Sequence, residues 1–414
     1  MKLCKSLYTL ISIFRQVLFF LSLNIGNYFI CSSLKWGVLT IIKTCDVGSM
    51  PFPGNFKKFI NGAQHIDPLM ELLRVNKDSK ERKYFEDKVV QNYIDKIKVG
   101  IDVPSYPQFR DMNEMFLNTI KGIKKSKRGY EVIDRLTLKK GYASILEVRV
   151  LKQKKREISQ KIGKTLKVRL CITGPYTLAS TCVNKNADLV KKFGEAIEQI
   201  IDENCFKGKY GGISIVSIDE PVFGMVDDPQ LDVGSRGRET LMKTWENICH
   251  RIKLKSIQSC LHLHSTKNED FWGIKSLDIV ESHVNDTLYT SNETKKILEK
   301  EDKYLKASIS ITVFDELIRK KIERDIRPIN ESTLNQKMAD AWTGIKNNRI
   351  TAVDYIETLE IMKKRLLQII NRYDIERVPY AGPECGLKSF PTYNASIECL
   401  KRVVGATQET NNTQ

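Results

Sequence analysis

The chain has 414 residues, of which 41% are hydrophobic and 28% are charged, so it can form a folded core and is not a disordered protein. The net charge of +17 would suit an anionic partner, but the lysines are spread along the chain. The tightest basic cluster, Lys124–Arg128, lacks the interleaved aromatic residues of a groove that binds single-stranded nucleic acid, so we expect no nucleic-acid partner.

Residues 1–35 differ in composition from the rest. Between Gln16 and Leu34 there is no charged residue, but several polar ones weaken the case for a membrane span, and no Ala-x-Ala-like cleavage site follows. Three interpretations stay open: a membrane anchor, a signal-like leader, or upstream sequence translated from a misassigned start, which we favour. Membrane association through residues 7–34 is therefore not our preferred interpretation.

Apolar runs typical of β-strands alternate with helical stretches from Trp36 onward. Amphipathic spacing predicts helices over 67–75, 81–97, 188–204, 238–252, 357–373 and 395–404. Strands are predicted over 38–45, 167–172, 213–218, 256–264, 277–280 and 378–381. We expect one large domain over residues 36–405, followed by a polar, disordered tail over 406–414.

Strands that alternate with helices indicate a parallel sheet, either open or closed into a barrel. Residues with reactive side chains fall at or just after the carboxyl ends of strands along the whole chain: Ser49, Asp219, His262, His264, Glu281 and Cys385. Convergence at one rim is typical of a barrel, and the glycine-rich phosphate loop of many open sheets is not found. We therefore predict an α/β fold, a (β/α)8 TIM barrel.

Two histidines stand one residue apart, His262 and His264, in a run that reads as a strand. Residues two apart in a strand point the same way, so both imidazoles leave one face. Imidazole is the commonest neutral metal ligand, which favours a metal site. The same spacing also fits a pair of hydrogen-bonded histidines at a strand end.

A zinc site follows if Glu281 and Cys385 join the two histidines at one rim, since zinc accepts nitrogen, oxygen and sulfur donors. One carboxylate and one thiolate would balance the charge of the ion, and a weakly held Glu281 could yield an exchangeable position. Alternatives remain open: Cys260 shares the face of the histidines, Glu281 could pair with a lysine, and Cys385 could be a buried structural thiol. A thiol bound to zinc becomes a nucleophilic thiolate, so this ligand set predicts a thiol alkyl transferase.

Several segments, in order along the chain, resemble the catalytic barrel of the cobalamin-independent methionine synthases, in the single-barrel form found in archaea and some bacteria. The segments are Val47–Pro51, Tyr106–Met112, Thr173–Leu178, Ser217–Pro221, the His262/His264 strand, Glu281 and Pro383–Lys388. The resemblance implies a zinc-dependent methyltransferase that acts on the thiol of homocysteine to give methionine in the cytoplasm. Ten cysteines without regular spacing fit such a reducing compartment.

The resemblance assigns His262, Glu281 and Cys385 to the histidine, glutamate and distant cysteine positions of the zinc site. His264 stands where the family has a cysteine, which would raise the formal charge of the site by one. Asp219 and His262 are the expected catalytic residues.

Substrate-binding positions carry over as well. Ser49 and Asp219 match positions that hold the carboxylate and the ammonium of homocysteine, and Gln108 and Asp111 lie in a segment that lines the same pocket. The second barrel and the histidine-bearing loop of the folate-using enzymes are not found. This favours a methyl-corrinoid or corrinoid protein as donor over a methyl-folate.

Two other functions remain open. One is a zinc-dependent alkyl transferase acting on another thiol, such as coenzyme M; Asp219 argues against it, because that thiol has no ammonium. The other is a non-catalytic, basic binding protein on a barrel scaffold, suggested by the charge and the apolar leader.

Overall fold

The computed structural model describes residues 41–65 and 79–413. The expected leader, the apolar segment 7–34 and the helix expected over 67–75 lie outside the described residues. Among the described helices, none is both long and apolar enough to cross a bilayer.

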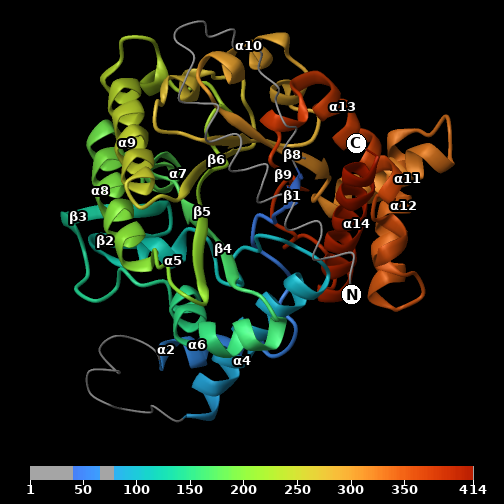
Figure 1. Cartoon of the computed structure of the whole chain (residues 1–414), viewed down its shortest axis with the longest axis horizontal. Helices are drawn as coiled ribbons and strands as arrows, with labels where there is room; N and C mark the ends of the chain where they lie inside the picture. The colour runs from blue at the N-terminus through green and yellow to red at the C-terminus, as the bar shows by residue number, and fades with distance from the viewer. Residues whose placement is uncertain (1–40, 66–78, 414) are drawn as a thin grey trace, which may run out of the picture. The chain divides into compact units, whose positions relative to one another are not determined.

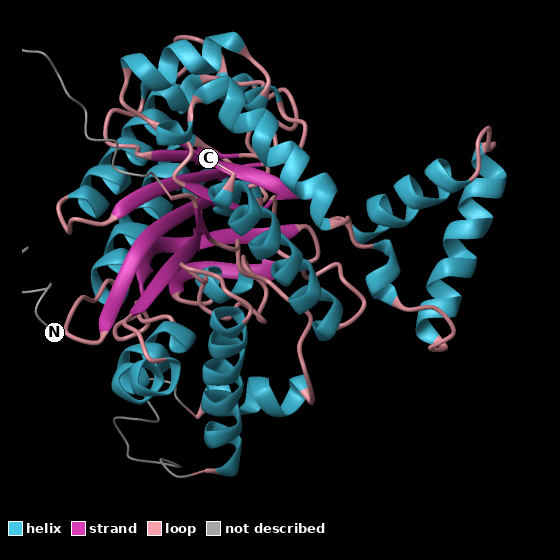
Figure 2. Ribbon diagram, turned by 45° about the vertical axis from the view of Figure 1, so that its right-hand side comes forward, coloured by secondary structure: helices cyan, strands magenta, loops and turns pink. Residues whose placement is uncertain are grey.

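Seven parallel strands form one curled sheet with helices around it (Figure 2), which confirms the α/β class. The order across the sheet is β1-β9-β8-β7-β6-β5-β4. The strands are β1 Lys43–Thr44, β4 Leu166–Thr173, β5 Gly211–Glu220, β6 Gln258–Leu263, β7 Ile279–Glu281, β8 Tyr304–Ser310 and β9 Tyr380–Pro383. A separate antiparallel hairpin consists of β2 Ile120–Ser126 and β3 Gly129–Leu138.

The two edges of the sheet, β1 and β4, are connected through residues 103–105. Isolated parallel bridges join Cys45 to Val103 and Ser105 to Arg169. The sequence predicted a closed barrel of eight strands. The structure has seven strands in one sheet, and residues 103–105 form single bridges to both edges of that sheet.

The helices alternate with the strands along the chain (Figure 1). Their bounds are α2 Phe56–Gln64, α4 Lys80–Lys98, α5 Glu114–Leu117, α6 Leu146–Ile162, α7 Pro175–Ser180, α8 Ala187–Asn204, α9 Arg236–Lys253, α10 Asn292–Lys300, α11 Phe314–Asp325, α12 Glu331–Lys346, α13 Leu359–Tyr373 and α14 Tyr393–Asn412. Short 3-10 turns are η1 Pro229–Leu231, η2 Asp270–Gly273, η3 Thr287–Tyr289, η4 Ala352–Tyr355 and η5 Ile375–Arg377. Several helices start at a side-chain cap, such as Ser235, which accepts from the backbone N–H of Arg238 before α9.

Inward-facing side chains of the sheet are arranged in layers. The layer toward the amino ends of the strands, which we call the lower layer, is largely apolar. It comprises Cys45, Val103, Ile215, Cys260, Ile279 and Tyr380. Toward the carboxyl ends of the strands the interior becomes polar, with Arg169, Glu281 and Lys306 all buried. Buried charged residues thus lie toward the carboxyl rim, which is the end of the sheet where barrels of this kind have their functional sites.

Residues 406–412 are helical, which corrects the disordered tail expected over 406–414. Helix α14 continues to Asn412, and Ala406, Thr407 and Thr410 are buried. The threonine hydroxyls donate to carbonyls one turn back in the same helix, so these polar residues can be buried without unpaired groups. The polar composition that suggested disorder therefore belongs to a packed helix.

The end of α14 is held to β1 by Asn411. Its Oδ1 accepts from the N–H of Ile42 at 3.1 Å, and its Nδ2 donates to the carbonyl of Ile42 at 3.0 Å. Asn411→Ala is expected to lower the free energy of unfolding by about 1–3 kcal/mol, because two half-buried backbone groups lose their partner. Urea unfolding would measure this change. Asn412→Ala, at an exposed neighbouring position, is the control and should have little effect.

Candidate metal and substrate site

Strand β6 and the residue directly after it place His262 and His264 on one side, in line with the alternation expected from the sequence. Leu261 and Leu263 are fully buried in the main core on the other side of the strand. The two imidazole rings are 5.4 Å apart between centroids, at 84° to each other. Cys260 lies in the lower apolar layer and is not part of the group around the histidines.

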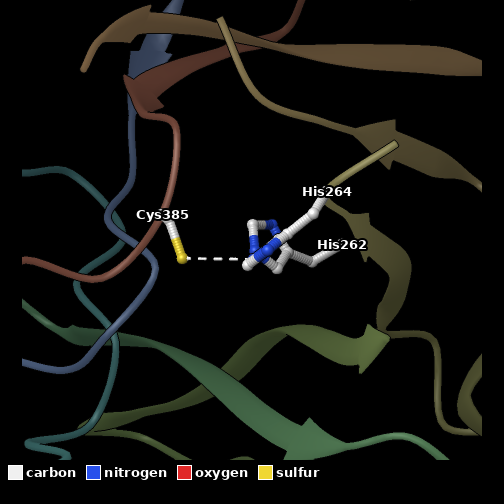
Figure 3. A group of neighbouring side chains, drawn as sticks. All are labelled: His262, His264 and Cys385. Carbon is white, nitrogen blue, oxygen red and sulfur yellow. Dashed lines mark hydrogen bonds between the residues drawn. The ribbon is translucent and has the colours of Figure 1, made fainter. Parts of the chain in front are cut away.

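Cys385 joins the two histidines from the loop after β9 (Figure 3). Ligand atoms of His262, His264 and Cys385 all lie within 4.8 Å of one another. The thiol Sγ of Cys385 is 3.5 Å from Nε2 of His264, although the two residues are 121 positions apart in the chain. Two imidazoles and a thiol in one cluster, with His262 buried and His264 and Cys385 half-buried, suit a zinc ion.

The protonation of these groups fits a cation site. Burial and the neighbouring His262 and His283 lower the pKa of His264 to about 2. Burial also lowers the pKa of His262 and raises the pKa of the Cys385 thiol to about 12. The imidazoles are therefore neutral donors at pH 7, and a divalent cation would displace the thiol proton on binding.

The carboxylate of Glu281 is engaged by other groups. It is completely buried and pairs with both terminal nitrogens of the Arg169 guanidinium and, at 2.9 Å, with Nζ of Lys306. Its Oε1 lies 2.9 Å from Nδ1 of His262. Burial opposes ionisation of Glu281, but the charges of Arg169 and Lys306 outweigh it and hold its pKa well below the usual range. The structure thus does not bring Glu281 into the group of three, and its partners include a lysine.

Asp219 lies at the carboxyl end of β5, opposite His262 in the register of β5 and β6. Its side chain accepts from the hydroxyl of Ser217 at 2.6 Å, and that hydroxyl accepts from Arg169 at 2.9 Å. Burial raises the pKa of Asp219 to about 7, against the opposing effects of the Arg169 charge and the Ser217 hydrogen bond. A buried carboxylate next to the histidine cluster can bind an ammonium group.

Ser49 and Gln108 lie together near the loop of Cys385. A parallel bridge joins their backbones. The carbonyl of Ser49 accepts from Leu387 at 2.6 Å, and a Cβ on Gly386 would come within 2.0 Å of the Ser49 hydroxyl. A side chain at position 386 would therefore displace Ser49, so glycine is needed there.

Asp111 is placed differently from the other predicted substrate residues. It is exposed, and its carboxylate accepts from the backbone N–H groups of Asn113 and Glu114 at the start of α5. It lines a cavity of about 800 Å³ whose wall also includes Met50 and Lys388, close in sequence to Ser49 and Cys385. The structure does not place its carboxylate in the histidine cluster.

A third histidine at this rim, His283, was missed in the sequence. Its ring centroid is 4.0 Å from that of His264 and 6.5 Å from that of His262. Its Nε2 is buried without a hydrogen-bond partner among the described residues. The signal was present, because His283 stands two residues after Glu281 just as His264 follows His262. Three of the five histidines of the chain thus meet here.

The raised pKa of Asp219 leads to a pH dependence for the binding of any ammonium group at this carboxylate in the metal-free protein. The carboxylate is the form that pairs with an ammonium, so affinity for a primary-ammonium ligand should be constant from pH 8.5 to about pH 7. Below that pH it should fall about tenfold per unit as Asp219 takes up a proton. Calorimetric titrations across this range would measure the profile. Asp219→Asn should bind weakly with no such step, and a step that persists in this variant would assign it to another group.

Methionine synthases are similar to the chain in sequence and in fold. No family model matches the chain. The methionine synthase of Saccharolobus solfataricus is 29% identical over 192 residues, which cover 44% of this chain and 54%, about half, of that protein. A B12-independent methionine synthase from Shewanella sp. W3-18-1, solved in complex with selenomethionine, matches with a TM-score of 0.56 at 14% identity and covers 90% of this chain and 98% of its own. The resemblance to methionine synthases seen in the sequence is thereby confirmed, and the structural match shows a shared fold.

Proposed function

We propose that the chain is a zinc-dependent methyltransferase that transfers a methyl group to the thiol of homocysteine and so forms methionine. The observation that carries the proposal is the convergence of His262, His264 and Cys385 at the rim where Asp219 also lies. The names of the two similar proteins support the same reaction, and the Shewanella enzyme was solved with an analogue of its product, selenomethionine. The fold we propose is a full (β/α)8 barrel, in which residues 103–105 are the eighth strand.

In this proposal His262, His264 and Cys385 hold the zinc ion, which when bound lowers the pKa of the substrate thiol so that the thiolate forms near neutral pH. Asp219 pairs with the ammonium of homocysteine and Ser49 binds its carboxylate, so the substrate is held at both polar ends. Gln108, beside Ser49, supports that position. Binding at two points restricts the thiol to one orientation toward the donor.

We propose that the methyl donor binds in a cavity whose wall includes Met50 and Lys388, which stand close in sequence to Ser49 and Cys385. The cavity of about 800 Å³ is within the size of small-molecule sites and has a largely apolar wall that includes Phe52, Phe109 and Met115. A methyl-folate or a methyl-corrinoid would supply the methyl group. The similarity in fold to a B12-independent enzyme supports the folate, and the departures in sequence from the folate-using enzymes support the corrinoid.

The test uses the purified full chain. Zinc would be quantified by elemental analysis, and methyl transfer would be assayed from methylcobalamin and from methyltetrahydrofolate, each with homocysteine and with coenzyme M. We expect one zinc per chain and transfer to homocysteine alone. Transfer to coenzyme M would indicate the other thiol. Folded protein that binds no zinc and shows no transfer would contradict the proposal and favour a binding protein on a barrel scaffold.

A further inference from the structure

We propose that His283, and not Glu281, is the fourth protein ligand of the metal centre, while Glu281 orients His262 from outside the ligand set. This inference rests on the zinc site of the proposed function. It departs from the ligand set that the sequence resemblance implies, because it replaces the glutamate by a third imidazole.

Glu281 is unsuited to bind a metal because its oxygens already hold two buried cations. Arg169 and Lys306 are each about 1% exposed, and Glu281 contacts both of them. If the carboxylate moved to a metal ion, these two cations would lose their counter-charge in the interior. Removing one partner of a buried ion pair is strongly destabilising, and the metal bond would have to exceed that loss.

Glu281 is well placed for a different task. Its Oε1 lies 2.9 Å from Nδ1 of His262, so the carboxylate favours the tautomer with the proton on Nδ1. The contact of Nδ1 with Glu281 is close but lacks the geometry of a full hydrogen bond, so the carboxylate acts on this nitrogen mainly through its charge. That tautomer leaves the lone pair on Nε2, and this atom is buried without a hydrogen-bond partner among the described residues. A carboxylate that binds one nitrogen of a histidine makes the other nitrogen a better and better-oriented metal ligand.

His283 offers the remaining donor. Its ring lies 4.0 Å from the ring of His264, and its Nε2, like that of His262, is buried and unpartnered within the described part of the chain. Two nitrogens on one tetrahedral zinc lie about 3.3 Å apart, given zinc–nitrogen bonds of about 2.0–2.1 Å. The nitrogens of His283 are not among the ligand atoms that lie within 4.8 Å of one another, so its side chain must turn away from the ring of His264 to reach an ion that both share. Coordination would also satisfy two buried nitrogens that otherwise lack a partner.

Glu384 holds the two loops of this centre together. Its Oε2 accepts from the N–H of Val284, the residue after His283, at 2.8 Å. Its Oε1 accepts from the N–H of Thr312 at 2.8 Å, and Glu384 itself precedes Cys385. One buried carboxylate therefore fixes the backbone beside both His283 and Cys385. This connection keeps His283 at the rim even though it lies beyond the end of β7.

The ligand set changes the charge of the site. Three neutral imidazoles and one thiolate leave a Zn²⁺ centre with a net charge of +1, whereas a glutamate in place of one imidazole would make it neutral. A substrate thiolate that replaced one of the imidazoles, or that added to the four ligands as a fifth, would neutralise the +1 centre, so its binding would be favoured. A site with three imidazoles would therefore prefer an anionic sulfur ligand more strongly than a site with a glutamate ligand.

X-ray absorption of the zinc-loaded full chain tests the inference without any variant. We expect one sulfur and three imidazoles, the latter counted from their characteristic outer-shell scattering. One sulfur with two imidazoles and a carboxylate oxygen would overturn it.

Variants give an independent measurement through competition of the protein with a zinc chelator. His283→Ala should lower zinc affinity at least tenfold and remove one imidazole from the absorption spectrum. Glu281→Gln should keep the same number of zinc ligands under conditions in which the variant is folded. His250→Ala, at an exposed position on α9, is the control and should change neither quantity. If His283→Ala binds zinc with the affinity of the wild-type chain and its absorption spectrum still shows three imidazoles, His283 is not a ligand and only this inference fails. If zinc does not bind to the wild-type chain, the proposed function fails with it.

Discussion

Cys385→Ser is expected to lower zinc affinity by more than about 100-fold and to abolish methyl transfer, with the fold retained. Cys385 supplies the only anionic donor of the three ligand atoms that lie together, so its loss leaves only neutral imidazoles to hold a divalent cation. Losses of about 10–100-fold are typical when a group that merely orients a ligand is changed, and removal of a direct ligand should exceed that range. Zinc content after dialysis and the methylcobalamin assay would measure both effects.

The control for this variant is Cys205→Ser. Cys205 is a half-buried thiol at the end of α8, away from the histidine cluster. It should retain zinc and activity, and both proteins should show the same circular dichroism. Retention of zinc and of methyl transfer in Cys385→Ser would rule out the thiolate as a ligand and would assign the cysteine a structural role.

Glu281→Gln is expected to destabilise the fold by about 3–5 kcal/mol, the largest stability effect we predict for a single substitution. The amide cannot balance Arg169 and Lys306, which are both buried beside it. The lowered pKa of Glu281 adds a pH dependence: its stabilising contribution is complete above the unfolded pKa of about 4.3 and is lost as pH falls toward the lower folded pKa. The variant should lack this contribution at pH 7. Guanidinium unfolding at pH 7 and at several lower pH values down to pH 2 would show both effects.

Two comparisons test whether the loss of stability in Glu281→Gln comes from the missing negative charge. Glu293→Gln removes the partner of Lys296 in a pair whose side chains are 64% and 70% exposed, and it should cost at most about 1 kcal/mol. Replacing Arg169, Glu281 and Lys306 together by apolar residues should recover much of the lost stability, since no unpaired charge remains. A loss in Glu281→Gln no larger than in Glu293→Gln would show that the buried ion cluster is not stabilising.

Much of the fold followed from local patterns in the sequence. Helices α4, α8 and α9 and strands β4 to β6 lie within a few residues of their predicted bounds, because each has a clear apolar periodicity. Helix α6 and the β2–β3 hairpin were not predicted, since lysines on their exposed faces obscure that periodicity. The end of α14 was taken for a disordered tail because its buried residues are alanine and threonine rather than large apolar ones.

The sequence by itself determined that His262 and His264 leave β6 on one side, because the two-residue repeat of a strand is a local property. It also placed Asp219 at the carboxyl end of a strand and Cys385 just after one, and hence both at one rim. Only the tertiary structure decided what Glu281 contacts, since Arg169 is 112 residues away and no local pattern reports which side chains meet inside a curled sheet. The same holds for His283, whose approach to His264 depends on how two loops pack at the rim. Which of these residues can bind a metal and which only surround it therefore depends on contacts between distant parts of the chain. No short stretch of sequence encodes those contacts.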